Sequence, residues 1–317
     1  MAPASGGSLV AIGNFDGVHL GHQQVVADAV DSARRQGLRP IVLTFHPHPV
    51  TFLRGRPVEQ LTGVARRCEL LGRLDPELTV VTEPFDADFA GLSPQQFVED
   101  YLMGLLDARV VCVGDNFRFG HERAGDVAML TRLGAERGLV VRPHRLEADA
   151  AGTYSSSRAR HALREGDLAA FQLVTGRPHS VAGRVREGQR LGRALGVPTA
   201  NLHEVEEVLP LAGVYATAVE VTGAGAGEHR RLGIAATSVG TRPTIGDETV
   251  TVEAHLLGFD GDLYGQSLRV HFLHRLRGIE RFEGLEALKS QMRRDIDEVA
   301  RLLRDLSPDP RAQGGWF

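Results

Sequence analysis

The sequence predicts a doubly wound α/β domain built on a parallel sheet, followed by a small antiparallel β-barrel domain with a C-terminal helix. Three observations predict this class. Short apolar runs alternate with amphipathic helical patterns through the first half of the chain. After Gly176, segments of alternating polarity follow one another across glycine-rich turns. The 317 residues are also enough for two ordinary domains.

The strands of the first half are short and rich in β-branched residues, as buried parallel strands tend to be. They are expected at 8–15, 39–45, 78–85, 108–114 and 138–146. Helical patterns lie between and after them, at 22–36, 63–74, 93–106, 125–138, 156–166 and 167–176. Ser93 followed by Pro94 is typical of a helix start.

The second half alternates polar and apolar residues at 181–188, 213–223, 230–240, 249–258 and 266–277. We interpret the glycine-rich run 223–227 between two of these segments as a hairpin loop, because it opens no helix. Residues 284–306 repeat apolar positions every three or four residues, which predicts an amphipathic helix. We therefore expect domains at 1–178 and 179–306, with a flexible tail at 307–317.

Composition excludes several function classes. The formal net charge of −4 argues against a nucleic-acid binder. Lys289 is the only lysine and no P-loop is present, so ATP would have to be bound in another way. Neither a signal-peptide pattern nor an apolar run of about 20 residues occurs, which predicts a cytoplasmic protein without membrane contact. The two cysteines, Cys68 and Cys112, are expected to be reduced thiols in apolar surroundings, and self-association is left open.

The strongest local motif spans residues 13–22, where a predicted strand leads into a predicted helix. This is the point in an α/β sheet where phosphates bind. Glycines there allow the backbone to approach a ligand, and His19 and His22 are close enough in sequence to face one spot on the first helical turn. Two imidazoles in this place would stabilise charge during attack on a phosphorus atom.

The second domain has a motif set of its own. A glycine- and arginine-rich stretch at 183–193 is suited to wrapping phosphates, and it leads to the oxygen donors Thr199 and Asn201, which suit Mg²⁺. Glu253 lies among apolar residues in a predicted strand, where a carboxylate is costly unless it is used.

These motifs, together with residues 44–49, 114–120, 155–160 and 259–265, resemble the prokaryotic bifunctional riboflavin kinase/FMN adenylyltransferase (FAD synthetase) family over the whole chain. The His-x-Gly-His pattern is similar to that of nucleotidylyltransferases. The resemblance implies that the barrel domain phosphorylates riboflavin to FMN with ATP. It further implies that the α/β domain adenylylates FMN to FAD and releases pyrophosphate. Mg²⁺ would accompany ATP.

The resemblance also implies residue roles. His19, His22 and Glu253 would be catalytic, with the histidines holding ATP phosphates and Glu253 acting as general base toward the ribityl hydroxyl. The adenylyltransferase nucleotide and flavin sites would comprise Gly13, Phe15, Asp16, Gly21, His48, Asn116, Ser156, Ser157 and Arg160. The kinase sites would comprise Gly183, Gly188, Gly192, Arg193, Pro198, Thr199 and Asn201, of which Thr199 and Asn201 would bind the metal.

Three positions differ from the family pattern. Ser157 stands where threonine is usual, His46 where an acidic residue is common, and Arg242 where asparagine is usual. The last two leave open a single-activity enzyme, a kinase with a silent adenylyltransferase domain.

Two further alternatives remain at this point. One is a non-catalytic flavin-binding regulator on the same scaffold. The other is a metal hydrolase in which His19, His22, His46, His48 and Asp115 hold zinc.

Overall fold

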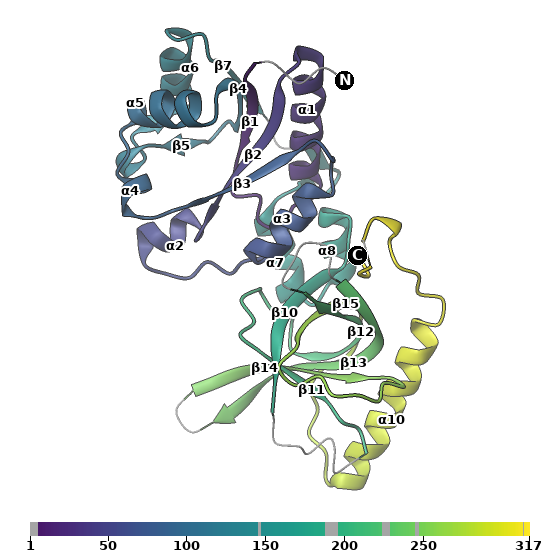
Figure 1. Cartoon of the computed structure of the whole chain (residues 1–317). Coiled ribbons are helices and arrows are strands. Elements are labelled where there is room, and N and C mark those ends of the chain that lie inside the picture. The colour runs from purple at the N-terminus through teal and green to yellow at the C-terminus, as the bar shows by residue number, and fades with distance from the viewer. Residues whose placement is uncertain (1–5, 145–146, 188–195, 224–228, 245–246, 313) are drawn as a thin grey trace. The chain divides into compact units, whose positions relative to one another are not determined.

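A computed structural model describes residues 6–144, 147–187, 196–223, 229–244, 247–312 and 314–317, with the side chains of 241–250 left out (Figure 1). The chain forms two compact units. The first comprises Met1–Val58 and Val64–Ser155, and the second comprises Glu59–Gly63 and Ser156–Phe317.

The first unit is built on a parallel five-stranded sheet of order β3-β2-β1-β4-β7. Its strands are β1 (Ser8–Ile12), β2 (Arg39–His46), β3 (Thr79–Pro84), β4 (Ala108–Gly114) and β7 (Val140–His144). In the central register Val10 lies opposite Ile41 of β2 and Val111 of β4. The apolar runs of the sequence become the strands of this sheet, with β1 and β2 mostly buried, and the predicted α/β architecture is confirmed.

Helices connect these strands. They are α1 (Leu20–Gln36), α2 (Pro49–Arg54), α3 (Val64–Gly72), α4 (Ala87–Ala90), α5 (Pro94–Gln96) and α6 (Val127–Ala135). The predicted helix at 93–106 begins with a capping box at Ser93, but its main part, Phe97–Leu105, is a π-helix. Two short ribbons, β5 (Arg118–Phe119) with β6 (Gly125–Asp126) and β8 (Ala148–Asp149) with β9 (Gly152–Thr153), complete the unit with the 3₁₀ turn His121–Arg123.

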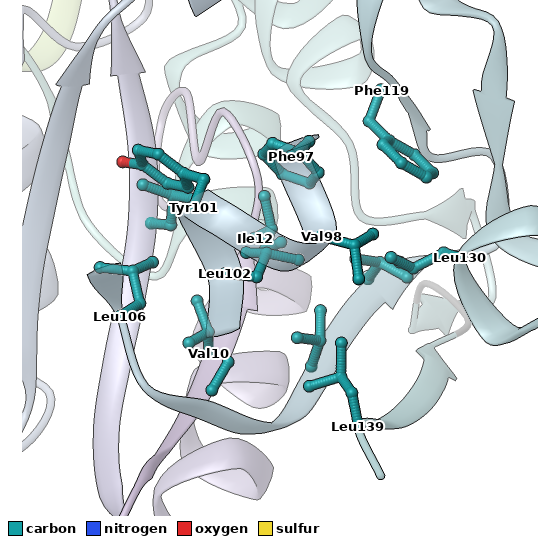
Figure 2. Close-up of a cluster of buried hydrophobic side chains, with 14 of the residues drawn as sticks. Val10, Ile12, Phe97, Val98, Tyr101, Leu102, Leu106, Phe119, Leu130 and Leu139 are labelled. Atoms are coloured by element: carbon teal, nitrogen blue, oxygen red, sulfur yellow. The ribbon is translucent and has the colours of Figure 1, made fainter. Parts of the chain in front are cut away.

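Each face of the sheet packs against an apolar cluster. On one face Val10 and Ile12 contact the side chains of the π-helix, including Phe97 and Leu102, and the labelled side chains converge there in Figure 2. Val26 of α1 belongs to the cluster on the other face. Coverage on both faces explains why the central strand β1 is buried along its whole length.

The second unit contains a closed antiparallel barrel of order β10-β11-β14-β13-β12-β15. Its strands are β10 (His179–Arg186), β11 (Ala200–His203), β12 (Gly213–Thr222), β13 (His229–Thr244), β14 (Asp247–Leu256) and β15 (Ser267–Arg277). The amphipathic helix α10 (Leu285–Leu302) packs Val299 against the barrel residues Ala216 and Ala236. This confirms the predicted barrel with a C-terminal helix.

The helices α7 (Ser156–Arg164) and α8 (Leu168–Thr175) belong to the barrel unit. The backbone N–H of Leu211 donates to the carbonyl of Leu163, and the ring of Phe171 contacts His179 at 5.0 Å. The compact units divide at 155/156 because these two helices pack on the barrel, and the domain boundary at 178 stays a prediction.

Residues near the end of the chain contact β12, and the flexibility expected of the segment 307–317 stays a prediction. A 3₁₀ turn forms at Pro310–Ala312, and Trp316 is only 9% exposed. The indole N–H of Trp316 donates to the carbonyl of Val219, and its backbone N–H donates to the Glu220 carboxylate. The final residues are therefore anchored to β12.

Among the described residues, no helix combines the length and the apolar character needed to cross a membrane.

Candidate active sites

The predicted adenylyltransferase residues of the first unit gather at the carboxyl edge of the parallel sheet. The adjacent strands β2, β1 and β4 end at His46, Ile12 and Gly114, and the loops that follow carry His48, the pair His19 and His22, and Asn116. Within the sheet, β2 lies next to β1 along one edge of that strand, and β4 lies next to β1 along its other edge. This switch in strand order is where open α/β sheets bind ligands.

The turn between β1 and α1 has an unusual backbone. Phe15 and Val18 have φ angles of 49° and 36°, in the region that favours glycine, and Gly17 has a φ of 81°. The N–H of Val18 donates to the Phe15 carbonyl at 3.0 Å, and the Gln23 amide donates to the Val18 carbonyl at 2.9 Å. Non-glycine residues hold such angles only where surrounding contacts enforce them, and they concentrate at functional sites.

His19 and His22 form a stacked pair at the N-terminus of α1. Their ring centroids are 3.5 Å apart, and His19 caps the helix by accepting from the N–H of His22 through Nδ1. A neutral His19 ring therefore carries its proton on Nε2. The first turn of α1 holds no acidic residue, so the positive end of the helix dipole adds to the imidazoles.

Gly13, Phe15, Asp16 and Gly21 shape the surroundings of this pair. The Phe15 ring meets the edge of His22 at 5.2 Å, and Asp16 is 3% exposed. A Cβ at Gly21 would lie 3.3 Å from the His19 ring, and one at Gly13 would lie 3.1 Å from the Phe15 ring. At both positions a side chain would crowd the turn.

His48 and Asn116 occupy the neighbouring loops. His48 caps α2, and its Nδ1 accepts from the N–H of Val50 at 3.2 Å, which again leaves the proton of a neutral ring on Nε2. The residue before it, Pro47, follows His46 through a cis peptide bond. Asn116 is exposed just beyond β4. Both side chains therefore sit on the same sheet edge as the histidine pair.

Sequence reasoning missed a buried arginine below this edge. Arg67 of α3 is 1% exposed and donates to the carbonyls of Asn14 and Phe45. Burial lowers the pKa of its guanidinium, and the Asp16 carboxylate opposes that shift. The signal in the sequence was an arginine three and four residues before Leu70 and Leu71, on the apolar face of its helix.

Ser156, Ser157 and Arg160 lie in the first turns of α7, in the second unit. The Arg160 side chain donates to the carbonyl of Glu59 at 2.6 Å. A closing role toward the triphosphate stays a prediction for these three residues.

The predicted kinase residues meet on the barrel wall. Glu253 of β14 lies directly opposite Asn201 of β11 on one side and Ser238 of β13 on the other. Val252 and Ala254 are buried, whereas Glu253 is half-buried, so Glu253 lies on the outer side of the strand. The structure brings Asn201 and Glu253 side by side, although 51 intervening residues separate them in the sequence.

The segment before β11 lies beside this row. The Asn201 amide donates to the carbonyl of Thr199 at 3.3 Å, and the carbonyl of Pro198 lies 2.8 Å from Nδ1 of His255, a neighbour of Glu253 on the outer face of β14. Ser238 is a further hydroxyl in the row that sequence reasoning did not single out. Its strand position was predicted, but its cross-strand partner was not.

Gly183 has a structural role in addition to its predicted role in binding. A Cβ there would lie 2.7 Å from the carbonyl of His203, so glycine permits β11 to approach β10. Gly188, Gly192 and Arg193 lie outside the described residues.

These two arrangements define the class of the protein. A histidine pair at a helix N-terminus, on the switch point of a parallel sheet, is suited to nucleotide phosphates. A carboxylate beside neutral oxygen donors on a barrel is suited to proton abstraction next to a nucleotide. Together they indicate a transferase with two phosphate-handling sites on one chain.

Comparison with known proteins agrees. Residues 2–158 match the family model for FAD synthetase, and residues 175–303 match that for riboflavin kinase. Bifunctional riboflavin kinase/FMN adenylyltransferases of Escherichia coli K12 and Pseudomonas fluorescens are each 36% identical to this chain. The matches cover 91% of this chain and 90% of the E. coli protein, and 93% of this chain and 93% of the P. fluorescens protein. The Bacillus subtilis protein of the same name is 33% identical over 94% of this chain and 93% of its own length.

The chain belongs to the bifunctional riboflavin kinase/FMN adenylyltransferase family, and it is an enzyme of flavin-cofactor biosynthesis. Among solved structures, one described as a macrolide-efflux protein from Streptococcus pneumoniae has a TM-score of 0.78 at 28% identity. That likeness covers 96% of this chain and 95% of that one.

The alternative of a zinc hydrolase finds no support in the geometry. Within the described ranges, no group of three or more histidine, cysteine, aspartate or glutamate side chains is arranged to hold a metal ion. The His19 and His22 rings lie 20° from parallel, whereas two ligands of one metal would point their ring nitrogens at a common centre. Family membership accounts for both units, which the hydrolase alternative did not.

Proposed function

We propose a division of labour in which the barrel unit makes FMN from riboflavin and the α/β unit makes FAD from that FMN, each with ATP. The observation that carries the proposal is the presence of two separate sites of matching chemistry. One is the histidine pair at the N-terminus of α1, and the other is the cross-strand pair Asn201 and Glu253.

In the α/β unit, a phosphate oxygen of FMN attacks the α-phosphorus of ATP. The bond from that phosphorus to the bridging oxygen breaks, and pyrophosphate leaves with the bond electrons. His19 and His22 donate hydrogen bonds to the phosphate oxygens as charge develops, in the positive field of the α1 N-terminus. His48 and Asn116 line the nucleotide and flavin pocket from the loops after β2 and β4.

In the barrel unit, Glu253 takes the proton from the ribityl 5′-hydroxyl of riboflavin. The resulting oxygen nucleophile attacks the γ-phosphorus of ATP, and ADP leaves. The half-buried position of Glu253 on the strand keeps the carboxylate accessible while restricting the water around it. Asn201, directly opposite, is placed to orient the nucleotide at the same point.

The donor set also fits a divalent cation bound mainly through nucleotide phosphates. Thr199 and Asn201 offer neutral oxygens, which suit Mg²⁺, and Glu253 lies beside Asn201. When bound, Mg²⁺ would neutralise charge on the transferring phosphoryl group. We further propose that the enzyme is cytoplasmic and does not bind nucleic acid, in keeping with its net charge of −4, and that self-association is compatible with the proposal.

A product assay tests the proposal. The purified protein is supplied with riboflavin, ATP and Mg²⁺, and the flavins are separated by chromatography over time. We expect FMN to rise first and then to give way to FAD. FMN that accumulates without FAD would establish the single-activity alternative, with His46 as the first residue to substitute. The absence of any phosphorylated flavin would contradict both activities.

A further inference from the structure

Helix α3 carries a buried cation that the two reactions do not use. Nη1 of Arg67 donates to the carbonyl of Asn14 at 2.9 Å, and Nη2 donates to the carbonyl of Phe45 at 3.1 Å. A guanidinium is planar and rigid, so one group that bonds two carbonyls also sets the distance between them.

Those carbonyls belong to the two segments that carry the candidate site. Asn14 lies in the turn that leads to His19, and Phe45 lies near the end of β2, shortly before His48. The Asn14 carbonyl also accepts from the Thr44 hydroxyl of β2 at 3.1 Å. One side chain from a third element therefore joins the turn after β1 to the end of β2.

Burying the charged side chain of Arg67 at this position costs free energy. Its side chain is 1% exposed, and burial lowers its pKa, so its charge has been removed from water. Apolar side chains at such sites often give equal or greater stability. The Asp16 carboxylate, in the same strained turn, compensates part of the cost. This pattern favours a role in holding the turn over a role in packing alone.

We propose that Arg67 is a positioning residue for adenylyl transfer. It holds the β1–α1 turn and the end of β2 at the spacing that places His19, His22 and His48 around the nucleotide. The inference rests on the proposed function of those histidines and goes beyond it, because Arg67 acts on them through the backbone.

The test uses the full-length chain with Arg67→Met and Arg67→Lys. Adenylyl transfer is measured with supplied FMN, and riboflavin phosphorylation is measured on the same preparation. We expect Met to lower the kcat of FAD formation about 100-fold, the usual cost of a site misplaced by about 1 Å. The KM for FMN should stay within about threefold, since transition-state contacts are lost rather than uniform binding. Lysine should recover part of the loss, because its ammonium reaches one carbonyl at a time.

A matched control separates positioning from stability. Leu71 lies on the same helix, is 0% exposed and belongs to the core cluster that includes Val26. Leu71→Ala weakens that packing without removing either bond to the carbonyls. We expect it to keep the kcat of FAD formation within about threefold at a temperature where it is folded. An equal loss in Leu71→Ala, or a loss of kinase turnover in Arg67→Met, would overturn the proposal.

If Arg67→Met does not fold, Thr44→Val provides a second test of the positioning role. It removes the second bond to the same Asn14 carbonyl, so its effect and that of Arg67→Lys should be coupled rather than additive. Unchanged kcat in both variants would reject the positioning role. His22→Ala in the same assay distinguishes the two failures. If it also kept full activity, the proposed site itself would be wrong, whereas an inactive His22→Ala beside an active Arg67→Met would reject Arg67 alone.

Discussion

At the scale of single residues, His22 carries the proposed adenylyl transfer most directly. Its ring stacks on His19 at the start of α1, where a phosphate would meet imidazole donors and the helix dipole together. Loss of one preorganised donor to a developing charge typically costs about 10²–10³ in rate. We therefore expect His22→Ala to lower FAD formation from supplied FMN by about that factor, with riboflavin phosphorylation unchanged. Chromatographic assays of both steps on one preparation check this, and equal loss of both activities would argue against separate sites.

Glu253 is the corresponding residue in the barrel. A general base contributes about 10²–10⁴-fold, so Glu253→Gln should lower FMN formation within that range. Conversion of supplied FMN to FAD should continue at the wild-type rate. Thr251, whose hydroxyl contacts the Glu253 carboxylate at 3.5 Å, offers a milder control, and Thr251→Val should cost much less. A Glu253→Gln enzyme with normal kinase turnover would remove Glu253 from the mechanism.

At the scale of elements, the last residues of the chain stabilise the barrel. Glu220 of β12 is 0% exposed and accepts from Arg269 at 2.9 Å and from the backbone N–H of Trp316 at 2.6 Å. Replacing a buried Trp by Ala typically costs about 3–5 kcal/mol. We expect Trp316→Ala to lower the unfolding free energy of the barrel unit by about that much. Urea denaturation followed by circular dichroism measures it. A change below about 1 kcal/mol would mean that the tail contributes little.

The buried Glu220 carboxylate also makes the stability of the barrel sensitive to acid. Burial alone would raise the pKa of Glu220, but His271, Arg269 and the Trp316 N–H lower it to about 2. A carboxylate with a depressed folded pKa contributes stability above its unfolded pKa, and that stability is lost as the pH falls toward 2.

His179 adds a second pH dependence at higher pH. Burial lowers its pKa in the folded protein to about 4, whereas its ordinary pKa is 6.5. As the pH falls from 6.5 to 4, the unfolded chain takes up a proton that the folded protein does not, so the stability decreases.

Stability measured against pH can separate the two groups. The unfolding free energy of the wild-type protein should fall as the pH decreases from 6.5. Glu220→Gln should make this pH dependence shallower only below about pH 4.5. His179→Gln should make the pH dependence of the unfolding free energy shallower between about pH 4 and pH 6.5. A pH profile of Glu220→Gln parallel to the wild-type profile below 4.5 would contradict the assignment.

Elements with strong local patterns were predictable, and those held by distant contacts were not. Strand β4 occupies the predicted range 108–114, since a short run rich in β-branched residues favours a strand. The contact between Trp316 and Glu220 could not be predicted, because 95 residues separate the two in the sequence. Arg67 was missed for the same reason, since its partners Asn14 and Phe45 lie far away in sequence.

At the scale of the whole molecule, we propose that the two units divide the chemistry. The candidate site residues His19, His22 and Asn201 could be proposed from the sequence because they stand in short local patterns that resemble the family. The cross-strand pairing of Asn201 with Glu253 needed the barrel register. The amphipathic patterns of α7 and α8 show that these helices pack, but the sequence does not show that they pack on the barrel.

The central claim is that one chain holds two independent transfer sites linked by FMN. The most direct measurement mixes His22→Ala and Glu253→Gln enzymes with riboflavin, ATP and Mg²⁺, and follows FAD by chromatography. Each variant alone should make little FAD, whereas the mixture should make it, because FMN released by one variant becomes the substrate of the other. If the mixture formed no more FAD than the better single variant, while both proteins were folded, the division of labour between the two units would be contradicted.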